Sequence, residues 1–491
     1  MRTLEIILLL IVTILPFIKR PVLRRVQANY ILLALGVLLI LHLVIEGWRW
    51  QMIPAYLVII ILSWRIKVTD LTHPYKLSLL KASGFFGVII LALAGWVLTI
   101  VFPVFNFPTP RGAYNVGTAS IYERTNMDEI ITKDPNDKRE LTFKIWYPSD
   151  ADVSKLKGET YLNYGERSGF AVKYGAPPNT LHYLDYIETY VYPEIPIAQG
   201  PFPVLIFSHG YGSQPTGYYA LLTEVASHGY VIINMNHTYE SLGATFPDGS
   251  VKYFDYQFQI DVSSESMAVI QPLIDAFDSD MDFEERHPII RNVVKNYFVG
   301  RSQDRWADDM LFAIEQLDKW NTKGLLKGKL DLNKIGIFGH SNGGGSAGNA
   351  AIKDTRVKAV ANLDGLQWGD MIDSTYRIPY LVMGSHWPDD HPNINAHVHI
   401  NKSTDYFYES MLVNSGHPNF MDIPFVFPIP EISECGEIDP YLGMEIITKL
   451  TTSFFDKHLK NLPDADPQKI GEQYELLQLK VYKGDSIASQ K

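Results

Sequence analysis

The serine of the stretch GHSNG (339–343) stands between two glycines, after an apolar run, KIGIFG (334–339), and before a run of small residues, GGGSAGNAA (343–351). This order is typical of a sharp strand–turn–helix elbow, in which flanking glycines let strand and helix pack closely and lift the serine hydroxyl clear of the backbone. Because the G-x-S-x-G pattern alone also fits an ordinary glycine-rich turn, the flanking strand and helix are the evidence. We therefore predict that Ser341 is a catalytic nucleophile.

The second feature is a histidine that could activate this serine, since a hydroxyl needs a base that is held by a third group. His417 lies in GHPNF, between the strand-like run 405–413 and the helical run 444–459. The chain order serine, acid, histidine requires the base after the last central strand, where His417 lies. Four other histidines lie near motif positions, and each fits a structural role in a loop: His209, His228, His237 and His340.

Two positions could supply the acid. Asp364 ends the strand-like run VKAVANL (357–363), and Asp389, followed by Asp390, comes after the next strand. Both positions keep the order serine, acid, histidine, and the later one is the commoner location of the acid after such an elbow. The residues themselves leave both alternatives open.

A tetrahedral intermediate also needs backbone donors for its oxyanion. Asn342 is the residue after the nucleophile and supplies one N–H group. The second is expected from the loop SHGYGS (208–213), whose glycines let the backbone fold toward the site. We predict that this donor is the amide of Tyr211.

These residues need a sheet that brings them together. Strand-like runs occur at 141–148, 203–208, 230–235, 334–339, 357–363 and 379–384, and runs with helical periodicity lie between several of them, such as 218–229 and 305–320. Strands that alternate with helices predict an α/β domain with a mostly parallel sheet, in which ligands bind beyond the carboxyl ends of the strands. The candidate residues follow strands directly, as this arrangement requires.

The loop HWPDDHPNINAHVH (386–399) contains four histidines and could be interpreted as a metal site. Its pair His397 and His399 would point to opposite faces of a strand, and no metal-ligand spacing is matched. We therefore predict a solvated loop at the mouth of the site, with neither a metal nor an organic cofactor.

The first hundred residues have a different composition. Uncharged apolar runs occur at Ile6–Ile18, Asn29–Ile45, Gln51–Trp64 and Ala82–Pro110. The second and fourth are long enough to cross a hydrocarbon core of about 30 Å as helices, whereas the first and third are short. We predict a membrane domain of about four transmembrane helices at 1–106, a proline-rich linker at 107–115 and a catalytic domain at 116–491.

Charge indicates both topology and partners. Basic residues are numerous between runs one and two and between runs three and four, and only Arg49 lies between runs two and three. The positive-inside rule then places both ends of the four-helix unit, and the catalytic domain, outside the cytoplasm, in a multi-pass protein of the cell membrane. Residues 111–491 carry a net charge of −18, which argues against nucleic-acid binding. Cys435 is the only cysteine, which excludes an intramolecular disulfide.

The stretch 204–237 is similar to the SHG-x-G and ASHG segments of the platelet-activating factor acetylhydrolase family, the plasma and type II cytosolic enzymes. GHSNGG resembles the family's GHS-x-GG elbow, ANLDG places an aspartate after the next strand as the family does, and GHPNF resembles its His-x-Asn-Phe. The resemblance extends over roughly residues 110–460 and implies the α/β-hydrolase fold. It favours Asp364 over Asp389 and implies that Tyr211 and Asn342 are the oxyanion donors.

The prediction is thus a membrane-anchored serine esterase with the triad Ser341, His417 and Asp364, acting on short-acyl or oxidised phospholipids or related lipid esters. Two alternatives remain. A cutinase-like or general carboxylesterase, acting on polyesters or small esters, would keep the triad, and the GGG after the elbow also occurs in cutinase-like enzymes. A non-catalytic membrane interaction module would make the helices the working part, which the intact triad argues against.

Overall fold

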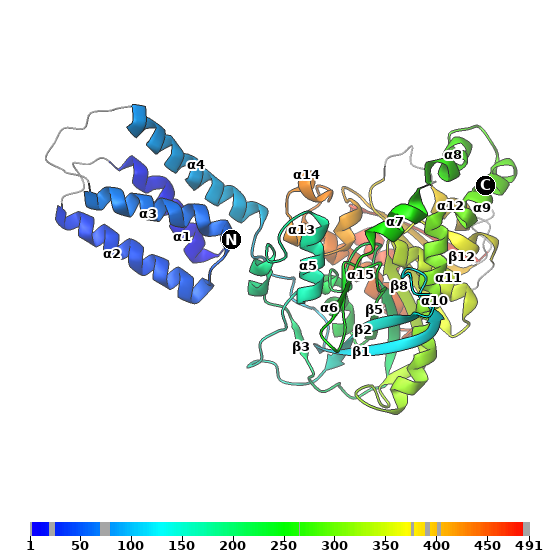
Figure 1. Cartoon of the computed structure of the whole chain (residues 1–491). Helices are drawn as coiled ribbons and strands as arrows, with labels where there is room; N and C mark the ends of the chain where they lie inside the picture. The colour runs from blue at the N-terminus through cyan, green and yellow to red at the C-terminus, as the bar shows by residue number, and fades with distance from the viewer. Residues whose placement is uncertain are drawn as a thin grey trace. The chain divides into compact units, whose positions relative to one another are not determined.

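The computed structural model describes residues 2–18, 25–68, 79–264, 266–374, 378–387, 393–399 and 404–484 (Figure 1). It divides into two compact units. Unit 1 comprises Met1–Asn106 with two short later segments, Thr180–Ile187 and Phe425–Ile429, and unit 2 comprises the remainder.

Unit 2 is built on a sheet of ten strands in the described chain, in the order β12-β11-β10-β9-β8-β4-β5-β2-β1-β3. The strands are β1 Asn115–Asp128, β2 Lys138–Ser149, β3 Val191–Pro193, β4 Phe202–Ser208, β5 Val231–Asn236, β8 Leu330–His340, β9 Val357–Leu363, β10 Tyr380–Gly384, β11 Thr404–Leu412 and β12 Leu477–Gly484; β6 Gly243–Thr245 and β7 Val251–Tyr253 form a separate hairpin.

The centre of the sheet is parallel. Strands β5, β4, β8, β9, β10 and β11 run in the same direction, whereas β2 and β12 pair antiparallel with its two edges. Every residue of β4 is buried, as expected of a strand that is covered on both faces. The predicted mostly parallel α/β sheet is therefore confirmed, and the carboxyl ends of its central strands meet at one edge.

Helices of unit 2 flank this sheet (Figure 1). The described helices that follow β2 in the chain are α5 Tyr164–Lys173, α6 Tyr219–Ser227, α7 Tyr256–Ser263, α8 Ser266–Phe277, α9 Phe283–Asn296, α10 Phe298–Thr322, α11 Asn342–Lys353, α12 Ile394–His399, α13 Ile423–Val426, α14 Pro430–Ser433, α15 Pro440–His458 and α16 Pro467–Gln473. Helix α10 packs against α11, and α6 packs against α15. On α10, Met310, Ala313 and Leu317 recur at helical spacing and join the buried core of the sheet.

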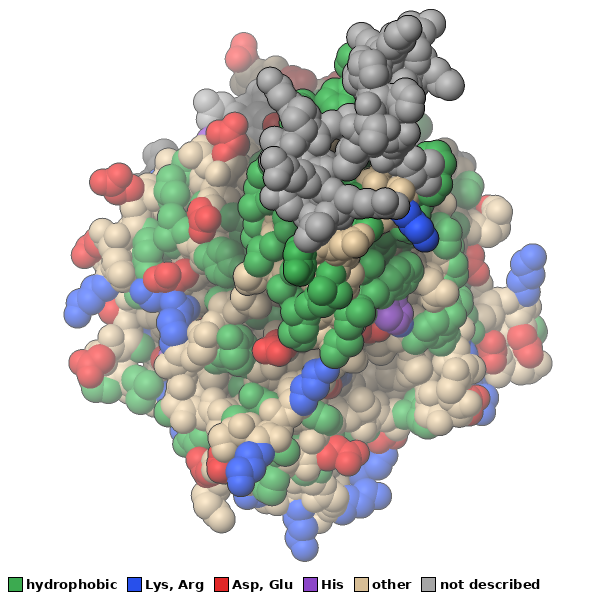
Figure 2. Space-filling model, turned by 90° about the vertical axis from the view of Figure 1, so that its left-hand side faces the viewer, with side chains coloured by type: hydrophobic (Ala, Val, Ile, Leu, Met, Phe, Trp, Pro, Cys, Tyr) green, Lys and Arg blue, Asp and Glu red, His purple; other side chains and the backbone are tan. Residues whose placement is uncertain are grey.

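The described part of unit 1 contains four apolar helices, α1 Thr3–Ile14, α2 Arg25–Leu41, α3 Ile53–Val68 and α4 Leu79–Val101. Inward-facing side chains of α1, α3 and α4, such as Leu8, Val58 and Ala92, form a buried cluster. The outward faces are apolar as well, and Figure 2 shows hydrophobic side chains gathered over these helices. A helix that is apolar all round is typical of a lipid or protein environment rather than water.

Two stretches of the described chain, Asn29–Glu46 and Ala82–Val101, are long and apolar enough to cross a membrane. The twelve residues of α1 extend only about 18 Å and the sixteen of α3 about 24 Å, short of the ~30 Å core. The described chain therefore has two candidate spans, and the predicted arrangement with four spans is not confirmed.

Ion pairs join the helices at one end of unit 1. The Arg49 guanidinium donates to both carboxylate oxygens of Glu5, at 2.6 and 2.8 Å, and to the carbonyl of Phe102, at 2.6 Å. The backbone N–H groups of Leu4 and Glu5 donate to the carboxylate of Glu46. The start of α1, the residues between α2 and α3 and the end of α4 therefore lie at the same end of the unit.

Candidate active site

Ser341 lies in the turn between β8 and α11 with φ 56° and ψ −122°, a conformation that non-glycine residues adopt only under strain. The neighbouring glycines are sterically required, because a Cβ on Gly343 would lie 2.4 Å from the Ser208 carbonyl oxygen, and a Cβ on Gly339 would lie 2.5 Å from the Gly343 backbone. The chain therefore has the geometry of a nucleophile elbow at the predicted position.

The candidate acid and base form a hydrogen-bonded pair at the same edge of the sheet. Asp364 follows β9 directly, and His417 begins a short 3-10 turn after β11. The distance from His417 Nδ1 to Asp364 Oδ2 is 2.6 Å. The Asp364 side chain is 1% exposed and the His417 side chain 39%, so the carboxylate is buried while the imidazole is accessible from solvent.

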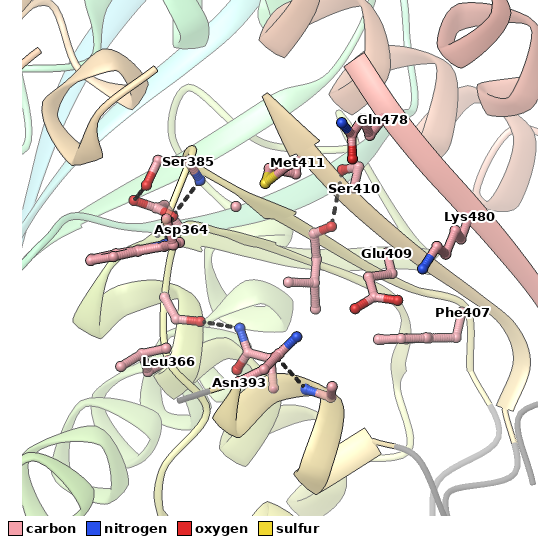
Figure 3. A pocket seen from close by; sticks show the side chains of 16 residues that line it. Asp364, Leu366, Ser385, Asn393, Phe407, Glu409, Ser410, Met411, Gln478 and Lys480 are labelled. Atoms are coloured by element: carbon pink, nitrogen blue, oxygen red, sulfur yellow. Dashed lines mark hydrogen bonds between the residues drawn. The ribbon is translucent and has the colours of Figure 1, made fainter. Parts of the chain in front are cut away.

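Asp364 accepts three further hydrogen bonds. The backbone N–H of Ser385 donates at 2.6 Å, its hydroxyl at 2.8 Å and the Trp387 indole N–H at 3.1 Å (Figure 3 shows the Ser385 bonds). Burial by itself would raise the pKa of Asp364, but the hydrogen bonds and charge of His417 and the Ser385 N–H outweigh it, so the pKa is lowered. The carboxylate is therefore ionised, as a group that orients an imidazole must be. The alternative acids Asp389 and Asp390 lie outside the described residues.

A second hydrogen-bonded chain connects the elbow to the histidine turn. His340 Nε2 lies 3.2 Å from the carbonyl oxygen of His417, which can only accept, so this nitrogen carries the proton. His340 Nδ1 then accepts from the Tyr218 hydroxyl at 2.9 Å, and this hydroxyl accepts from the N–H of Gly210 at 2.9 Å. Burial holds the pKa of His340 well below its usual value, so the ring is neutral. The rings of His340 and His417 lie 4.5 Å apart, which brings the residue before Ser341 beside the candidate base.

His340, Asp364 and His417 also offer three ligand atoms within 4.8 Å of one another, as a metal site would. The hydrogen bonds fit a metal poorly, because His340 Nε2 carries a proton and His417 Nδ1 is bound to Asp364. The side chains of His340, Asp364 and His417 are therefore arranged for hydrogen bonding rather than for holding a metal ion.

The predicted oxyanion donors lie on either side of the elbow. Asn342 is the first residue of α11, and Tyr211 is in the turn after β4. A Cβ on Gly210 would lie 3.2 Å from Ser341 Cβ, so the loop that carries Tyr211 passes directly beside the serine. Within the described ranges, neither the Tyr211 nor the Asn342 backbone N–H has a hydrogen-bond acceptor. Two free N–H groups next to the serine are what an oxyanion hole requires.

The histidine-rich segment differs from the sequence prediction. Residues Ile394–His399 form α12, and His397 and His399 are buried, so the prediction of a solvated loop was wrong for these residues. Both histidines pack against aromatic rings, His397 against Phe283 and His399 against Phe407. Alternating polar and apolar residues concealed a short buried helix. The remainder of the segment, from Pro388 to Pro392, lies outside the described residues.

A pocket of about 320 Å³ lies behind Asp364, between α12 and strands β10, β11 and β12 (Figure 3). Its wall includes Leu366, Phe407, Glu409 and Lys480, but neither Ser341 nor His417. It therefore lies on the side of the acid that is remote from the candidate nucleophile.

Sequence reasoning missed the residues that support the site. Ser385 follows β10 directly, so its position after a strand was a usable signal. Tyr218 carries no such signal, because its role depends on His340, which is remote in the sequence.

Comparisons with known proteins show the family and the fold of this chain. The profile of the family described as "Platelet-activating factor acetylhydrolase, isoform II" matches residues 99–252 and 308–476. The platelet-activating factor acetylhydrolase of Canis lupus familiaris is 25% identical over 74% of this chain and 79% of its own length. That of Bos taurus is 26% identical over 76% and 82%. The structure of a ferulic acid esterase from Streptomyces cinnamoneus superposes with a TM-score of 0.58 and 22% identity, over 77% of this chain and 99% of that one, which shows the α/β-hydrolase fold.

Proposed function

Since the chain belongs to the platelet-activating factor acetylhydrolase isoform II family and is a carboxylic ester hydrolase, we propose that it cleaves esters with Ser341 as nucleophile, His417 as base and Asp364 as acid. The observation that carries this proposal is the 2.6 Å hydrogen bond between His417 and Asp364, beside a strained serine at the end of the neighbouring strand. Chain order, strand position and the geometry of the His417–Asp364 pair agree with a Ser–His–Asp triad.

In this mechanism Ser341 Oγ attacks the ester carbonyl, and His417 Nε2 takes the hydroxyl proton. The N–H groups of Tyr211 and Asn342 stabilise the oxyanion of the tetrahedral intermediate. His417 then gives its proton to the leaving alcohol, and an acyl-enzyme remains on Ser341. Water, activated by the same imidazole, releases the acid. Asp364 stays ionised throughout and stabilises the imidazolium.

The proposed substrates are phospholipids with a short or oxidised acyl chain. The relatives' name describes the removal of an acetyl group from platelet-activating factor, and the α/β-hydrolase part of this chain is the part that resembles them. The stretch Asn29–Glu46, which begins in α2, and the stretch Ala82–Val101 of α4 are long enough to insert into a bilayer, so lipid esters would be available beside the enzyme.

We further propose that residues 1–106 anchor the protein as a multi-pass membrane domain and that 107–115 link it to an extracytoplasmic catalytic domain at 116–491. The basic-residue pattern supports this orientation. The two termini of the helical unit also lie at the same end, since Leu4 contacts Glu46 and Arg49 contacts Phe102.

The deciding experiment is labelling of the full-length protein with a fluorophosphonate, combined with turnover of a short-chain phospholipid and of p-nitrophenyl esters. The wild type should be labelled, and Ser341→Ala should lose both labelling and turnover while it keeps its thermal transition. Labelling that persisted in this variant would remove Ser341 from the mechanism. Turnover of p-nitrophenyl esters without any hydrolysis of the phospholipid would instead favour a general carboxylesterase.

A further inference from the structure

The chain contains a second Ser–His–Asp set, and this one is buried. Ser208 Oγ lies 2.8 Å from His237 Nε2, and His237 Nδ1 lies 2.7 Å from Asp309 Oδ2. Ser208 ends β4, His237 follows β5 and Asp309 lies on α10; all three residues are 0% exposed. A nucleophile must reach its substrate, so this set is not a second active site.

Its proton positions are fixed by Arg139 of β2, which donates to both Asp309 oxygens at 2.8 and 2.7 Å. Burial would raise the pKa of Asp309, but the charge of Arg139 outweighs it and holds the pKa well below its usual value. Because an ionised carboxylate only accepts, His237 Nδ1 carries the proton and Nε2 accepts from the Ser208 hydroxyl. Burial also lowers the pKa of His237, so the imidazole is neutral.

The buried set contacts the residue after Ser208, His209, through the backbone of His237. The backbone N–H of His237 donates to His209 Nε2 at 3.3 Å, so His209 carries its proton on Nδ1. That N–H donates to the carbonyl of Gly210 at 2.7 Å, and the N–H of Ser213 donates to the same oxygen at 3.1 Å. Burial lowers the pKa of His209 to about 3, which keeps this tautomer uncharged.

The orientation of the Gly210 carbonyl determines the orientation of the Tyr211 N–H. The Gly210 carbonyl and the Tyr211 N–H belong to one planar trans peptide, in which the two groups point in opposite directions. Two donors on the carbonyl therefore determine the direction of the Tyr211 N–H, which has no acceptor of its own within the described chain.

Helix α10 supports both sides of this arrangement. The Trp306 ring stacks on the His237 ring at 3.8 Å and 8°, and the Tyr211 ring lies 5.9 Å from Trp306 at 25°. One turn earlier, the Ser302 hydroxyl accepts from the side-chain amide of Asn342 at 3.1 Å. A single helix thus contacts both residues whose N–H groups serve the oxyanion in the proposed mechanism.

We propose that Ser208, His237 and Asp309, acting through His209, are positioning residues that aim the Tyr211 N–H at the oxyanion. This proposal rests on the proposed function, because it assumes chemistry at Ser341. The three side chains touch neither the substrate nor the reacting atoms, so their effect is on transition-state stabilisation and not on substrate binding.

The test uses Ser208→Ala, His209→Leu and His209→Asn in the full-length protein. His209→Leu removes the donor to the Gly210 carbonyl and should lower kcat on the order of 100-fold, with KM within about threefold. His209→Asn places an amide N–H near the position of Nδ1 and should recover at least about tenfold of this loss. Ser208→Ala should lower kcat about tenfold. His237→Asn removes the same hydrogen bond, so the double variant should have nearly the same kcat as His237→Asn alone.

The affinity for a transition-state analogue and the pH dependence of kcat/KM separate a positioning role from a loss of folded protein. Rates are expressed per site titrated with a fluorophosphonate, so that misfolded protein does not count. The affinity for a trifluoromethyl ketone, which forms a tetrahedral oxyanion on the serine, should fall by the same factor as kcat/KM. The pH dependence of kcat/KM should keep its midpoint, since His417 is unaltered. Ser227→Ala is the matched control, because this serine is also buried but bonds to the Glu224 carbonyl and should leave kcat unchanged.

The proposal is overturned if kcat per titrated site and ketone affinity stay within about twofold of wild type in Ser208→Ala and His209→Leu. If His209→Leu does not fold, Ser208→Ala decides, since alanine is nearly the size of serine, and a kcat and ketone affinity within about twofold of wild type in this variant overturn the proposal. Continued labelling of Ser341→Ala would reject the proposed function itself, which is a different result from normal kcat in the loop variants.

Discussion

At the scale of single residues, Asp364 is the side chain of the candidate site that is held by the most hydrogen bonds described above. Asp364 has φ 52°, an unfavourable conformation for an aspartate, and it accepts four hydrogen bonds. Such strain persists only where surrounding bonds determine it, and it is common at functional sites.

The first prediction concerns the choice of acid. Asp364→Asn should lower kcat on the order of a thousandfold or more, because the amide removes the charge and can hold His417 in the wrong tautomer. Asp389→Asn and Asp390→Asn should each cost less than about tenfold, as expected of residues outside the triad. The three variants are compared by turnover of a short-chain ester per titrated site. The reverse ranking would move the acid to the strand after β9.

The second prediction concerns Tyr218, which bonds to both Gly210 and His340. Tyr218→Phe leaves the buried Gly210 N–H without an acceptor, so we expect a loss of about 1–3 kcal/mol in the free energy of unfolding. We also expect about a tenfold fall in kcat, since the loop and the elbow lose a common support. Tyr230→Phe is the control, because its hydroxyl bonds to Asp456 and it should lose stability without losing kcat. Equal kcat in the two variants would show that Tyr218 has only a structural role.

At the scale of elements, the sequence predicted the parts that are mostly buried. The runs 203–208 and 357–363 became β4 and β9, because a strand that is covered on both faces is mostly apolar; all of β4 is buried, and all of β9 except Lys358. Strand β1, which lies between β2 and the short edge strand β3, was missed, since its residues alternate between buried and exposed and include Glu123 and Arg124. Helix α12 was missed because six residues are too few for a helical period to be recognised.

The candidate site shows the same limit. The candidate residues Ser341, Asp364 and His417 were predicted because each follows a strand, and in the structure all three lie at the same edge of the sheet. Tyr218 and Ser302 could not be found, because their partners His340 and Asn342 are determined by tertiary packing.

The third prediction uses helix α5, which carries a buried carboxyl group. Burial raises the pKa of Glu166 to about 7, against 4.5 in its ordinary state, although a hydrogen bond from Thr216 lowers it. A raised pKa in the folded state gives stability that is fully present below pH 4.5 and is lost as the pH rises to 7. We therefore expect the free energy of unfolding of Glu166→Gln to rise, relative to that of wild type, by on the order of 3 kcal/mol between pH 4.5 and 8.

The measurement is the free energy of unfolding of both proteins from pH 4.5 to 8, because the difference cancels the other titrating groups. The exposed Glu188 supplies a control for the Glu-to-Gln substitution itself. A difference that does not change with pH would mean that Glu166 is ionised throughout this range.

At the scale of the whole molecule, charge separates the two parts of the chain. Residues 1–110 carry a net charge of +7 and the remainder −18. The basic residues of the first part are concentrated between runs one and two and between runs three and four, while the acidic part follows the last apolar helix. The positive-inside rule uses the basic residues between the apolar runs rather than the net charge of the large domain, and their distribution favours a catalytic part outside the cytoplasm.

The last prediction is the orientation of the catalytic part. Unit 1 has the start of α1 and the end of α4 at one end, joined by Glu5, Arg49 and Phe102, so residues 2 and 107 should lie on the same side of a membrane that the unit crosses. Protease added to intact cells should therefore remove the chain after residue 111, and a reporter that is active only in the cytoplasm should stay silent when fused at Lys491. The same reporter inserted at residue 70, between α3 and α4, is the control and should be active, since basic residues surround that position. A protected catalytic domain in sealed cells, with an active reporter at Lys491, would reverse the topology and place the esterase on the cytoplasmic face.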